Sequence, residues 1–461
     1  VSDKVKLVPI GWFTEKSSRH LFQIIVDEDK RDDVINHFYK NEIYPGVHYV
    51  DNTLYPMYFN SYGTCPKAHQ YSKQIITLPI HLEVLREDCE RVEKITFCIP
   101  SKNNCRYLKA CIPSIRKNAY RKDHDIIVFV DADEDGTVEW LESVRDKYKI
   151  EFIVNGSDEL YGIGRAYDKC VEESKTDIFM IFHADMMLAK DADLEAFKYL
   201  DKKKVVCATR IEPPLHPENG EKIIRDFGMW PEPDVEEGWK EKDFDEYVEE
   251  VKVEHKDKIT NGCFAPWMMY KKDFISIGGH DPRFASARED SDVFNRLVLG
   301  GFELIQSWQS FVYHLTARAG QFQHGKLTQD HSQKSEEWRK LMSNSTREFF
   351  RKWGSTVNHD QYMMPIISPK YDIGFVVKNC NEHLLGILEP WCSTIYVDCE
   401  IEKYIESEQP NTTDNLTKKI LSIHSEKQND IVVSFDGLKL TNEEFQFIQQ
   451  LPLVIKDSGE I

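Results

Sequence analysis

Acidic and histidine side chains recur between the apolar runs in the middle of this 461-residue sequence. These residues are Asp131, Asp133, His183, Asp185, Glu289, Asp290 and His314. Carboxylates accept hydrogen bonds from N–H and hydroxyl groups, and together with imidazoles they transfer protons or bind divalent cations. Residues of these types, repeated next to apolar segments, indicate a site that binds a polar ligand and acts on it.

The segments around these residues alternate between strand-like and helix-like patterns. Strand-like runs occupy Lys94–Pro100, Asp125–Val130, Ile150–Val154 and Asp177–Phe182, and helix-like stretches occupy Val138–Tyr148 and Gly164–Glu173. This alternation is typical of right-handed βαβ units and a mainly parallel sheet. Ligands of such sheets bind at the carboxyl ends of the strands, so we expect the polar segments after the strands to form one site.

Those polar segments form an ordered set. They are Pro100-Ser101-Lys102-Asn103-Asn104, Asp131–Thr137, His183-Ala184-Asp185, Gly278–Asp281, Arg288–Asp292 and Val312-Tyr313-His314. In this order and spacing they resemble the GT-A-fold glycosyltransferases of the large inverting family 2, over about Ile95 to Gly325. The resemblance implies an α/β fold with a Rossmann-like, mainly parallel mixed sheet. It also implies an enzyme that moves a sugar from a nucleotide sugar to a glycan or lipid-linked hydroxyl acceptor, with inversion.

The resemblance assigns the donor site to the ends of the first strands. It implies that Asp131 and Asp133 hold the base and ribose of a UDP-sugar or another nucleotide sugar, because carboxylates accept hydrogen bonds from uracil N–H and ribose hydroxyl groups. The other residues implied in nucleotide-sugar binding are Pro100, Ser101, Asn103, Gly164, His183 and Ala184. The alternative for the two aspartates is an acidic surface turn that Gly136 closes.

His183-Ala184-Asp185 stands where the family has its D-x-D motif, so a histidine replaces the first acid. By the resemblance, Asp185 is a metal ligand and His314 closes the metal or diphosphate site, with Mn²⁺ or Mg²⁺ as the cofactor. His183 itself is a candidate ligand for the metal or the ribose. Its alternative is a histidine at a strand end that hydrogen-bonds to the backbone.

Glu289-Asp290 matches the acidic pair that precedes a helix in the family. The resemblance implies that Asp290 takes the proton of the acceptor hydroxyl, and that Glu289 orients it or holds acceptor hydroxyls. Asp292 is a weaker candidate for the base. The alternative is that these acids favour the helix N-terminus through capping and the helix dipole, and both roles are compatible.

Several other features are assigned by position. Arg318 and Lys326 are expected near the diphosphate, and Asn261–Trp267 leads to the acceptor side in this fold. Three tryptophans are candidates for stacking on a sugar ring, although large aromatics more often belong to the core: Trp230, Trp267 and Trp308. The acidic stretch Asp234–Glu254 has helical apolar spacing, which predicts an amphipathic helix with a solvated face.

The first block carries a second resemblance. Its motifs are His20-Leu21-Phe22, Arg31-Asp32, Gly46-Val47-His48-Tyr49, Cys65-Pro66-Lys67-Ala68 and Leu78-Pro79-Ile80-His81. They look like the C-terminal small domain of DegT-type sugar aminotransferases, whose pyridoxal phosphate is held by a lysine in a large preceding domain. That lysine has no counterpart in this sequence, so we expect no pyridoxal phosphate. His48 and Tyr49 would approach a partner subunit, so we expect a homo-oligomer through this block.

We therefore expect three domains, in keeping with about 150 residues per domain. They are an aminotransferase-like fragment at 1–93, a GT-A domain at 94–355 and a small α/β domain of unknown role at 368–461. In the third, we expect strands at Asp372–Val377, Thr394–Val397 and Asp430–Ser434, helices at Glu382–Leu388 and Thr441–Gln450, and a strand-like Leu453–Ile455. The sequence starts at Val1 without a methionine or a signal sequence, and it stops at Ile461 just after the strand-like run, so both outer segments are expected to be incomplete.

Composition narrows the class of protein. Asp and Glu outnumber Lys and Arg by 78 to 59, and the net charge of −19 argues against general nucleic-acid binding. The longest apolar runs have about five or six residues, whereas a transmembrane helix needs about 20. The eleven cysteines are scattered, without a C-x-x-C pair, which favours reduced thiols in a cytoplasmic protein.

Two other functions stay open at the level of sequence. A nucleotidyltransferase on a related α/β sheet would need a glycine-rich basic loop after the first strand, and Pro100–Asn104 contains no glycine. A non-catalytic nucleotide- or sugar-binding module is compatible with the loss of the first D-x-D acid. Hydrolysis of nucleotide sugars would separate the enzyme from such a module.

Overall fold

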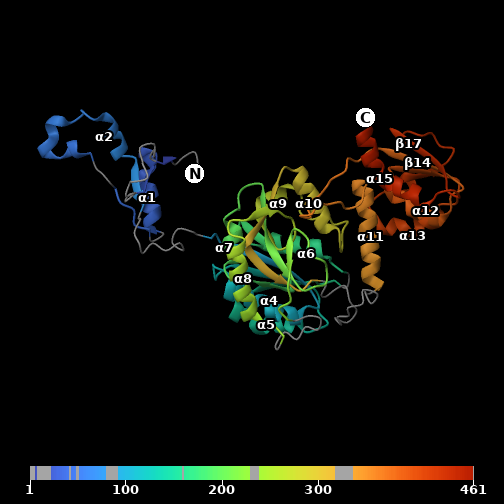
Figure 1. The fold of residues 1–461 in the computed structure, drawn as a ribbon, viewed down its shortest axis with the longest axis horizontal. Helices are drawn as coiled ribbons and strands as arrows, with labels where there is room; N and C mark the ends of the chain where they lie inside the picture. The colour runs from blue at the N-terminus through green and yellow to red at the C-terminus, as the bar shows by residue number, and fades with distance from the viewer. Residues whose placement is uncertain are drawn as a thin grey trace. The chain divides into compact units, whose positions relative to one another are not determined.

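The structure is a computed structural model, and it describes residues 6–7, 22–40, 43–47, 51–78, 92–157, 160–228, 238–316 and 336–459. The chain divides into two compact units, Val1–Arg91 and Val92–Ile461 (Figure 1). Some residues singled out from the sequence lie outside the described residues: His48, Tyr49, Trp230, Arg318 and Lys326.

A three-stranded antiparallel sheet forms the first unit, in the order β1-β2-β3. Its strands are β1 (Lys6–Leu7), β2 (Phe22–Ile25) and β3 (Ile75–Leu78), and its longer helices are α1 (Arg31–Lys40) and α2 (Pro66–Ser72). The core of this unit is small. Its buried residues are Ile24, Val26 and Ile76, and the apolar side of α1 packs against them.

A ten-stranded mixed sheet forms the centre of the second unit. Along its main path the strands follow the order β11-β13-β9-β12-β7-β4-β5-β6, with β10 paired to β9 and β8 paired to β13. The strands are β4 (Ile95–Lys102), β5 (Asp125–Ala132), β6 (Glu151–Val154), β7 (Ile178–Ile181), β8 (Met186–Leu188), β9 (Lys204–Glu212), β10 (Lys222–Ile224), β11 (Ile259–Asn261), β12 (Trp267–Tyr270) and β13 (Glu303–His314). Strands β7, β4, β5 and β6 run parallel, and β12 runs antiparallel to both neighbours. The predicted mainly parallel mixed sheet is therefore confirmed.

The helices of this sheet follow the predicted alternation. They include α4 (Cys105–Asn118), α5 (Thr137–Tyr148), α6 (Ile163–Glu173), α8 (Glu241–Glu254) and α10 (Glu289–Leu299). The predictions of α5 and α6 are confirmed, and α8 buries Phe244, Val248 and Val251 as its spacing predicts. Helix α4 was not predicted because Pro113 interrupts its pattern. None of the helices in the described ranges is both long and apolar enough to cross a bilayer.

A smaller parallel sheet lies near the C-terminus of the second unit, in the order β16-β15-β14-β17. Its strands are β14 (Ile373–Lys378), β15 (Thr394–Val397), β16 (Ile420–Ser422) and β17 (Ile431–Asp436), and its helices include α12 (Glu382–Leu388), α13 (Glu402–Glu408) and α15 (Asn442–Ser458).

The strand-like pattern of Leu453–Ile455 was misleading, because these residues lie within α15. A capping box of Thr441 and Glu444 starts that helix, and Ile448 and Leu451 bury its apolar side. Three apolar residues are too few to distinguish a strand from a helix.

Helix α11 (Glu336–Trp353) connects the two sheets of the second unit. Its C-terminal half packs on the 3₁₀ helix η6 (Glu389–Trp391), which precedes β15, and Phe350 stacks on Trp391. Trp353 Nε1 donates a hydrogen bond to Asp292 of α10 at 3.0 Å. Helix α11 is thereby attached to both the large sheet's helices and the C-terminal sheet.

Candidate active site

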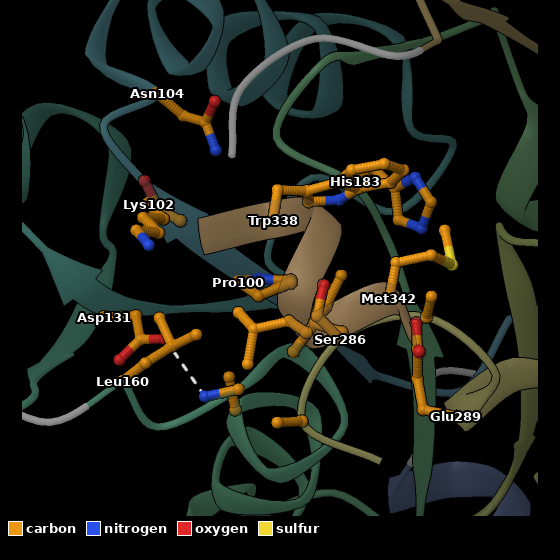
Figure 2. Close-up of a pocket in the computed structure, with 17 residues that line it drawn as sticks. Pro100, Lys102, Asn104, Asp131, Leu160, His183, Ser286, Glu289, Trp338 and Met342 are labelled. Carbon is orange, nitrogen blue, oxygen red and sulfur yellow. Dashed lines mark hydrogen bonds between the residues drawn. The ribbon is translucent and has the colours of Figure 1, made fainter. Parts of the chain in front are cut away.

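A cavity of about 340 Å³ lies where the parallel strands β4, β5 and β7 end (Figure 2). Among the predicted site residues, its lining includes Pro100, Ser101, Asp131, His183 and Glu289. Other lining residues are Lys102 at the end of β4, Asn104 just after it, Gly162 and Ile163 at the start of α6, and Trp338, Leu341 and Met342 of α11. The cavity therefore occupies the carboxyl edge of the sheet, where ligands of open α/β folds bind.

Three hydrogen bonds hold Asp131 at this cavity. Its Oδ1 accepts from the side-chain amide of Asn155 and from the backbone N–H of Tyr161, both at 2.8 Å. Its Oδ2 accepts from the backbone N–H of Gly162 at 3.1 Å. These bonds fix the turn that leads into α6. Because each carboxylate oxygen has two lone pairs, Oδ2 can also accept a hydrogen bond from a ligand.

Asn103 and Asp133 are not among the described residues that line the cavity. The carboxylate of Asp133 accepts from the backbone N–H groups of Thr137 at 2.6 Å and Val138 at 3.1 Å, so it caps α5. Asn103 exchanges two hydrogen bonds with Glu134, at 2.8 and 3.2 Å. Both side chains stabilise the turns next to the cavity, and their part in nucleotide binding stays a prediction.

Gly164 and Ala184 lie behind the cavity surface rather than among its described lining residues. A Cβ on Gly164 would lie 3.0 Å from the Cβ of His280 and 3.3 Å from the Cβ of Glu289. The absence of a side chain at 164 therefore lets the segment that carries Glu289 approach α6 closely. Ala184 is buried between His183 and Asp185. A direct contact of either residue with a nucleotide sugar stays a prediction.

His183, Asp185 and His314 form a group whose donor atoms all lie within 4.8 Å of one another. His183 Nδ1 lies 3.4 Å from His314 Nε2, which lies 3.6 Å from Asp185 Oδ1. Burial and the neighbouring His314 lower the pKa of His183 to about 3, so its imidazole is neutral at physiological pH and carries a lone pair. Two imidazoles and one carboxylate are a donor set that fits a divalent cation, and the imidazoles favour Mn²⁺ over Mg²⁺.

His314 is oriented by Glu212 of β9, a residue that the sequence analysis missed. Its Nδ1 lies 2.8 Å from Glu212 Oε1, so Nδ1–H donates and the lone pair of Nε2 is directed toward Asp185. Glu212 also pairs with Arg210 and Lys222, each at 3.1 Å. Although burial opposes it, the charge of Arg210 and the hydrogen bond from His314 hold the pKa of Glu212 well below its usual range. A carboxylate behind a histidine is common at metal sites, where it fixes the ring and raises its basicity.

Glu289 and Asp290 begin α10, and they face different cavities. Glu289 lines the first cavity, where its Oε2 is shielded from solvent and has no hydrogen-bond partner among the described residues (Figure 2). Burial and the charge of Asp290 raise the pKa of Glu289 to about 8. Asp290 lines a second cavity of about 300 Å³, and its Oδ1 accepts from the backbone N–H of Ser291 at 2.6 Å.

The pKa of Glu289 leads to a testable pH dependence of stability. The folded protein holds a proton on Glu289 up to about pH 8, whereas an unfolded chain releases it near its ordinary pKa of 4.5. The native state therefore loses stability as pH rises from about 4.5 to about 8, and Glu289→Gln removes this loss. We compare the melting temperatures of Glu289→Gln and wild type by differential scanning fluorimetry. We expect the difference between them to shift in favour of the variant by roughly 5 °C from pH 5 to pH 9. A constant difference across this range would contradict the buried, protonated Glu289.

Asp292 and two of the candidate tryptophans have structural roles. Asp292 is fully buried, and it pairs with Arg296 at 2.8 Å and with Lys352 at 2.5 Å. Trp267 and Trp308 are only 3% and 5% exposed, so the candidate role of stacking on a sugar ring does not apply to them. Trp267 lies on β12, between β7 and β9, and its ring packs against Phe179, Phe274 and Phe294. The interpretation of large aromatics as core residues is confirmed for both.

Comparison with known proteins decides the family of the central part. Residues 96–272 match the model of glycosyl transferase family 2. These residues form a family 2 glycosyltransferase domain. The match begins within β4 and ends after β12, so it contains Asp131, His183 and Asp185. The predicted resemblance is confirmed, and Glu289, Asp290 and His314 lie beyond the matched residues.

The first block has its own family match. Residues 5–96 match the DegT/DnrJ/EryC1/StrS aminotransferase family, which confirms the second resemblance. The absence of pyridoxal phosphate and the homo-oligomer stay predictions. A comparison with curated proteins gives no match.

Solved glycosyltransferase structures resemble the chain only weakly. They include GalNAc-T7 with UDP, GalNAc and Mn²⁺ (11% identity, TM-score 0.38, 56% of this chain and 50% of that one). Another is S. aureus TarS (12% identity, TM-score 0.35, 56% of this chain and 44% of that one). A third is S. aureus TarS 1–349 in complex with UDP (10% identity, TM-score 0.35, 56% of this chain and 72% of that one). The chain thus spans about half the length, or less, of the first two structures. At these TM-scores, nothing about the ligands of this chain follows from the similarity.

Proposed function

We propose that this protein is a metal-dependent, inverting glycosyltransferase that uses a UDP-sugar or another nucleoside-diphosphate sugar and a hydroxyl acceptor. The family 2 domain at 96–272 supports sugar transfer as the reaction class. The observation that carries the proposal is that a candidate nucleoside-binding acid, a candidate metal-binding group and a candidate base lie at the same edge of the sheet. Asp131 lines the cavity, the His183–Asp185–His314 group includes one of its lining residues, and the acidic pair separates it from a second cavity.

In the proposed donor site, Asp131 binds the nucleoside and the three-residue group holds Mn²⁺. When bound, the cation neutralises charge that develops on the diphosphate leaving group. His183 is neutral, and Glu212 orients His314, so each imidazole has one ring nitrogen without a proton that would serve as a metal ligand. Glu289 is protonated below about pH 8, so it adds no negative charge next to the diphosphate at neutral pH.

In the proposed transfer step, the acceptor oxygen attacks the anomeric carbon of the donor sugar. The bond from that carbon to the diphosphate oxygen breaks, and the nucleoside diphosphate leaves with the bonding electrons. Asp290 takes the proton of the acceptor hydroxyl, so the attacking oxygen becomes part of a neutral glycosidic bond. Attack on the face opposite the leaving group inverts the configuration at the anomeric carbon.

The metal requirement can be tested with UDP as the probe. We expect Mn²⁺ to tighten UDP binding to the EDTA-treated wild type, because a cation held by the three residues would neutralise charge on the diphosphate. Asp185→Asn should lose about ten-fold or more of this Mn²⁺-dependent affinity, as measured by isothermal titration calorimetry. Asp146→Asn is the matched control, since Asp146 is an exposed residue of α5. Equal UDP affinity with and without Mn²⁺ would contradict the metal site.

The reaction class can be tested with a panel of nucleotide sugars. Release of UDP and free sugar supports the glycosyltransferase. Binding of UDP without turnover of any nucleotide sugar would instead support a non-catalytic binding module. Formation of a nucleotide sugar from sugar phosphate and UTP, with release of pyrophosphate, would support a nucleotidyltransferase.

A further inference from the structure

The second cavity, on the Asp290 side of α10, has no role in the donor site described above. Its volume of about 300 Å³ is at the lower end of the range for small-molecule sites. Ala287 and Met342 line both cavities, so the two cavities share a wall. Glu289 lies on one side of this wall and Asp290 on the other. A molecule in the second cavity would therefore be next to Asp290 and next to the donor.

The lining of the second cavity combines apolar surface with polar groups, and it also includes the charged residues Arg288 and Asp290. Phe264, from the loop before β12, and Phe294 of α10 provide the aromatic surface. The polar lining includes Asn295 of α10 and two residues that follow α11, Asn358 and His359. Sugar rings have apolar C–H faces and hydroxyl edges, so this combination suits a saccharide.

A hairpin at Val357–Pro365 forms one wall of this cavity. His359 and Pro365 form an antiparallel bridge, and Ile366 N–H donates to Asn358 O at 2.9 Å. The carboxylate of Asp360 accepts from the N–H groups of Tyr362 and Met364, at 2.8 and 2.9 Å, which stabilises the turn.

The hairpin is attached to the glycosyltransferase domain by a hydrogen bond. Cys263 Sγ donates to Met363 O at 3.0 Å. Cys263 lies within the family match at 96–272, whereas the whole hairpin lies beyond it. One wall of the cavity that Asp290 lines is therefore supplied by residues beyond the family match.

The backbone between the two cavities is strained. Ala287 and Arg288 have φ angles of 65° and 69°, a left-handed conformation that is unfavourable for residues with a Cβ. They directly precede the acidic pair at 289–290. Strained residues persist where the surrounding structure imposes them, and they cluster at active sites. Their position supports a functional role for the point where the cavities meet.

We propose that the second cavity is the acceptor subsite, that it takes one sugar ring with its reacting hydroxyl at Asp290, and that the Val357–Pro365 hairpin determines which sugar is accepted. This inference rests on the proposed function, since it needs a donor sugar in the first cavity. The chemistry is that of the transfer step: the proton of the hydroxyl goes to Asp290, and its oxygen bonds to the anomeric carbon. The hairpin residues that line the cavity are specificity determinants and take no part in bond breaking.

Steric blocking tests the subsite without knowledge of the natural acceptor. Asn358 is an exposed residue of the cavity lining, and Asn358→Trp places a large side chain at its mouth. Water still reaches Asp290, whereas a sugar does not. With the UDP-sugar that wild type hydrolyses fastest, we expect hydrolysis to stay within about two-fold, while transfer to p-nitrophenyl glycosides falls by about ten-fold or more. Gln361→Trp is the matched control, because Gln361 is exposed on the same hairpin and is not among the described lining residues.

His359→Ala provides a second test, which concerns specificity. We expect it to change the relative KM values among p-nitrophenyl glycosides of glucose, galactose, N-acetylglucosamine and N-acetylgalactosamine, with donor hydrolysis unchanged. Unchanged transfer by Asn358→Trp, or equal losses of transfer and hydrolysis, would overturn the inference. Wild-type hydrolysis without transfer to any of these glycosides would reject a sugar ring as the acceptor. Absence of both UDP binding and hydrolysis in wild type would instead reject the proposed function.

Discussion

Asp290→Asn is expected to lower the rate of sugar transfer by about 10²- to 10⁴-fold, the usual contribution of a positioned general base. Asparagine has the same shape, and its Oδ1 can still accept the hydrogen bonds from the N–H and hydroxyl of Ser291, which measure 2.6 and 3.2 Å in the wild type. It cannot take a proton from an acceptor hydroxyl. We therefore expect kcat to fall, while the affinity for UDP and Mn²⁺ in the other cavity stays within about two-fold. The fall in kcat is checked by measuring product formation by chromatography, and the unchanged affinity is checked by measuring UDP binding by calorimetry.

The neighbouring acid gives the sharpest control for this prediction. Glu289→Gln also replaces an acid of the first turn of α10, but on the donor side, and it should retain most of the transfer activity at neutral pH because Glu289 is already protonated there. Asp243→Asn, on the exposed side of α8, controls for the loss of one charge. A large loss of activity in Glu289→Gln together with normal transfer in Asp290→Asn would assign the base to Glu289.

Glu389→Gln is expected to lower the free energy of unfolding of the C-terminal sheet by about 3–5 kcal/mol, the usual effect of breaking a buried ion pair on one side. Glu389 and the side chain of Arg351 are fully buried, and they are joined by hydrogen bonds of 3.0 and 2.5 Å. Lys419 Nζ lies 2.8 Å from Glu389 Oε1. The amide removes the counter-charge that Arg351 and Lys419 share, although Arg351 keeps its ion pairs with Glu348 and Glu408. Urea denaturation followed by circular dichroism measures the loss, and Glu406→Gln, on the exposed side of α13, is the control.

The pH dependence of this effect has a definite sign. Although burial opposes it, the hydrogen bond from Arg351 and the charge of Lys419 lower the pKa of Glu389 to about 2, against an ordinary value of 4.5. The stabilisation is therefore complete above about pH 4.5, and it is lost as the pH falls from 4.5 toward 2. We expect the stability difference between wild type and Glu389→Gln to shrink over this acidic range. A difference that stays constant down to pH 2.5 would contradict an ionised, paired Glu389.

The same ion pair connects the C-terminal sheet to the donor cavity through α11. Arg351 lies in the last turns of this helix, whereas Trp338, Leu341 and Met342 of its first turns line the cavity. The spacing of these three residues, i, i+3 and i+4, could have marked them as one side of a helix. Only their contact with the strand ends of a distant segment identifies that side as part of a ligand site.

Local patterns predicted the secondary structure well where apolar spacing was regular. The alternation of strands and helices from Lys94 to Phe182 was enough to predict the parallel sheet, because buried parallel strands are apolar throughout. The patterns failed at α4, where Pro113 interrupts the helix, and at Leu453–Ile455, where three apolar residues belong to a helix. At α4, packing against the core outweighs the local preference. Leu453 and Val454 are exposed, and they continue a helix that the capping box at Thr441 begins and that Ile448 and Leu451 anchor in the core.

The sequence by itself determined that the polar residues after the strands lie at one edge of the sheet. The carboxyl ends of parallel strands meet at that edge whatever the details of packing. The sequence therefore predicted that Asp131 and His183 would line one cavity. Only the tertiary structure decided that Glu289 and Asp290, adjacent in sequence, face separate cavities, and that Glu212 orients a histidine 102 positions later. Such relations depend on how elements distant in the chain pack together, and no periodicity along the chain records that packing.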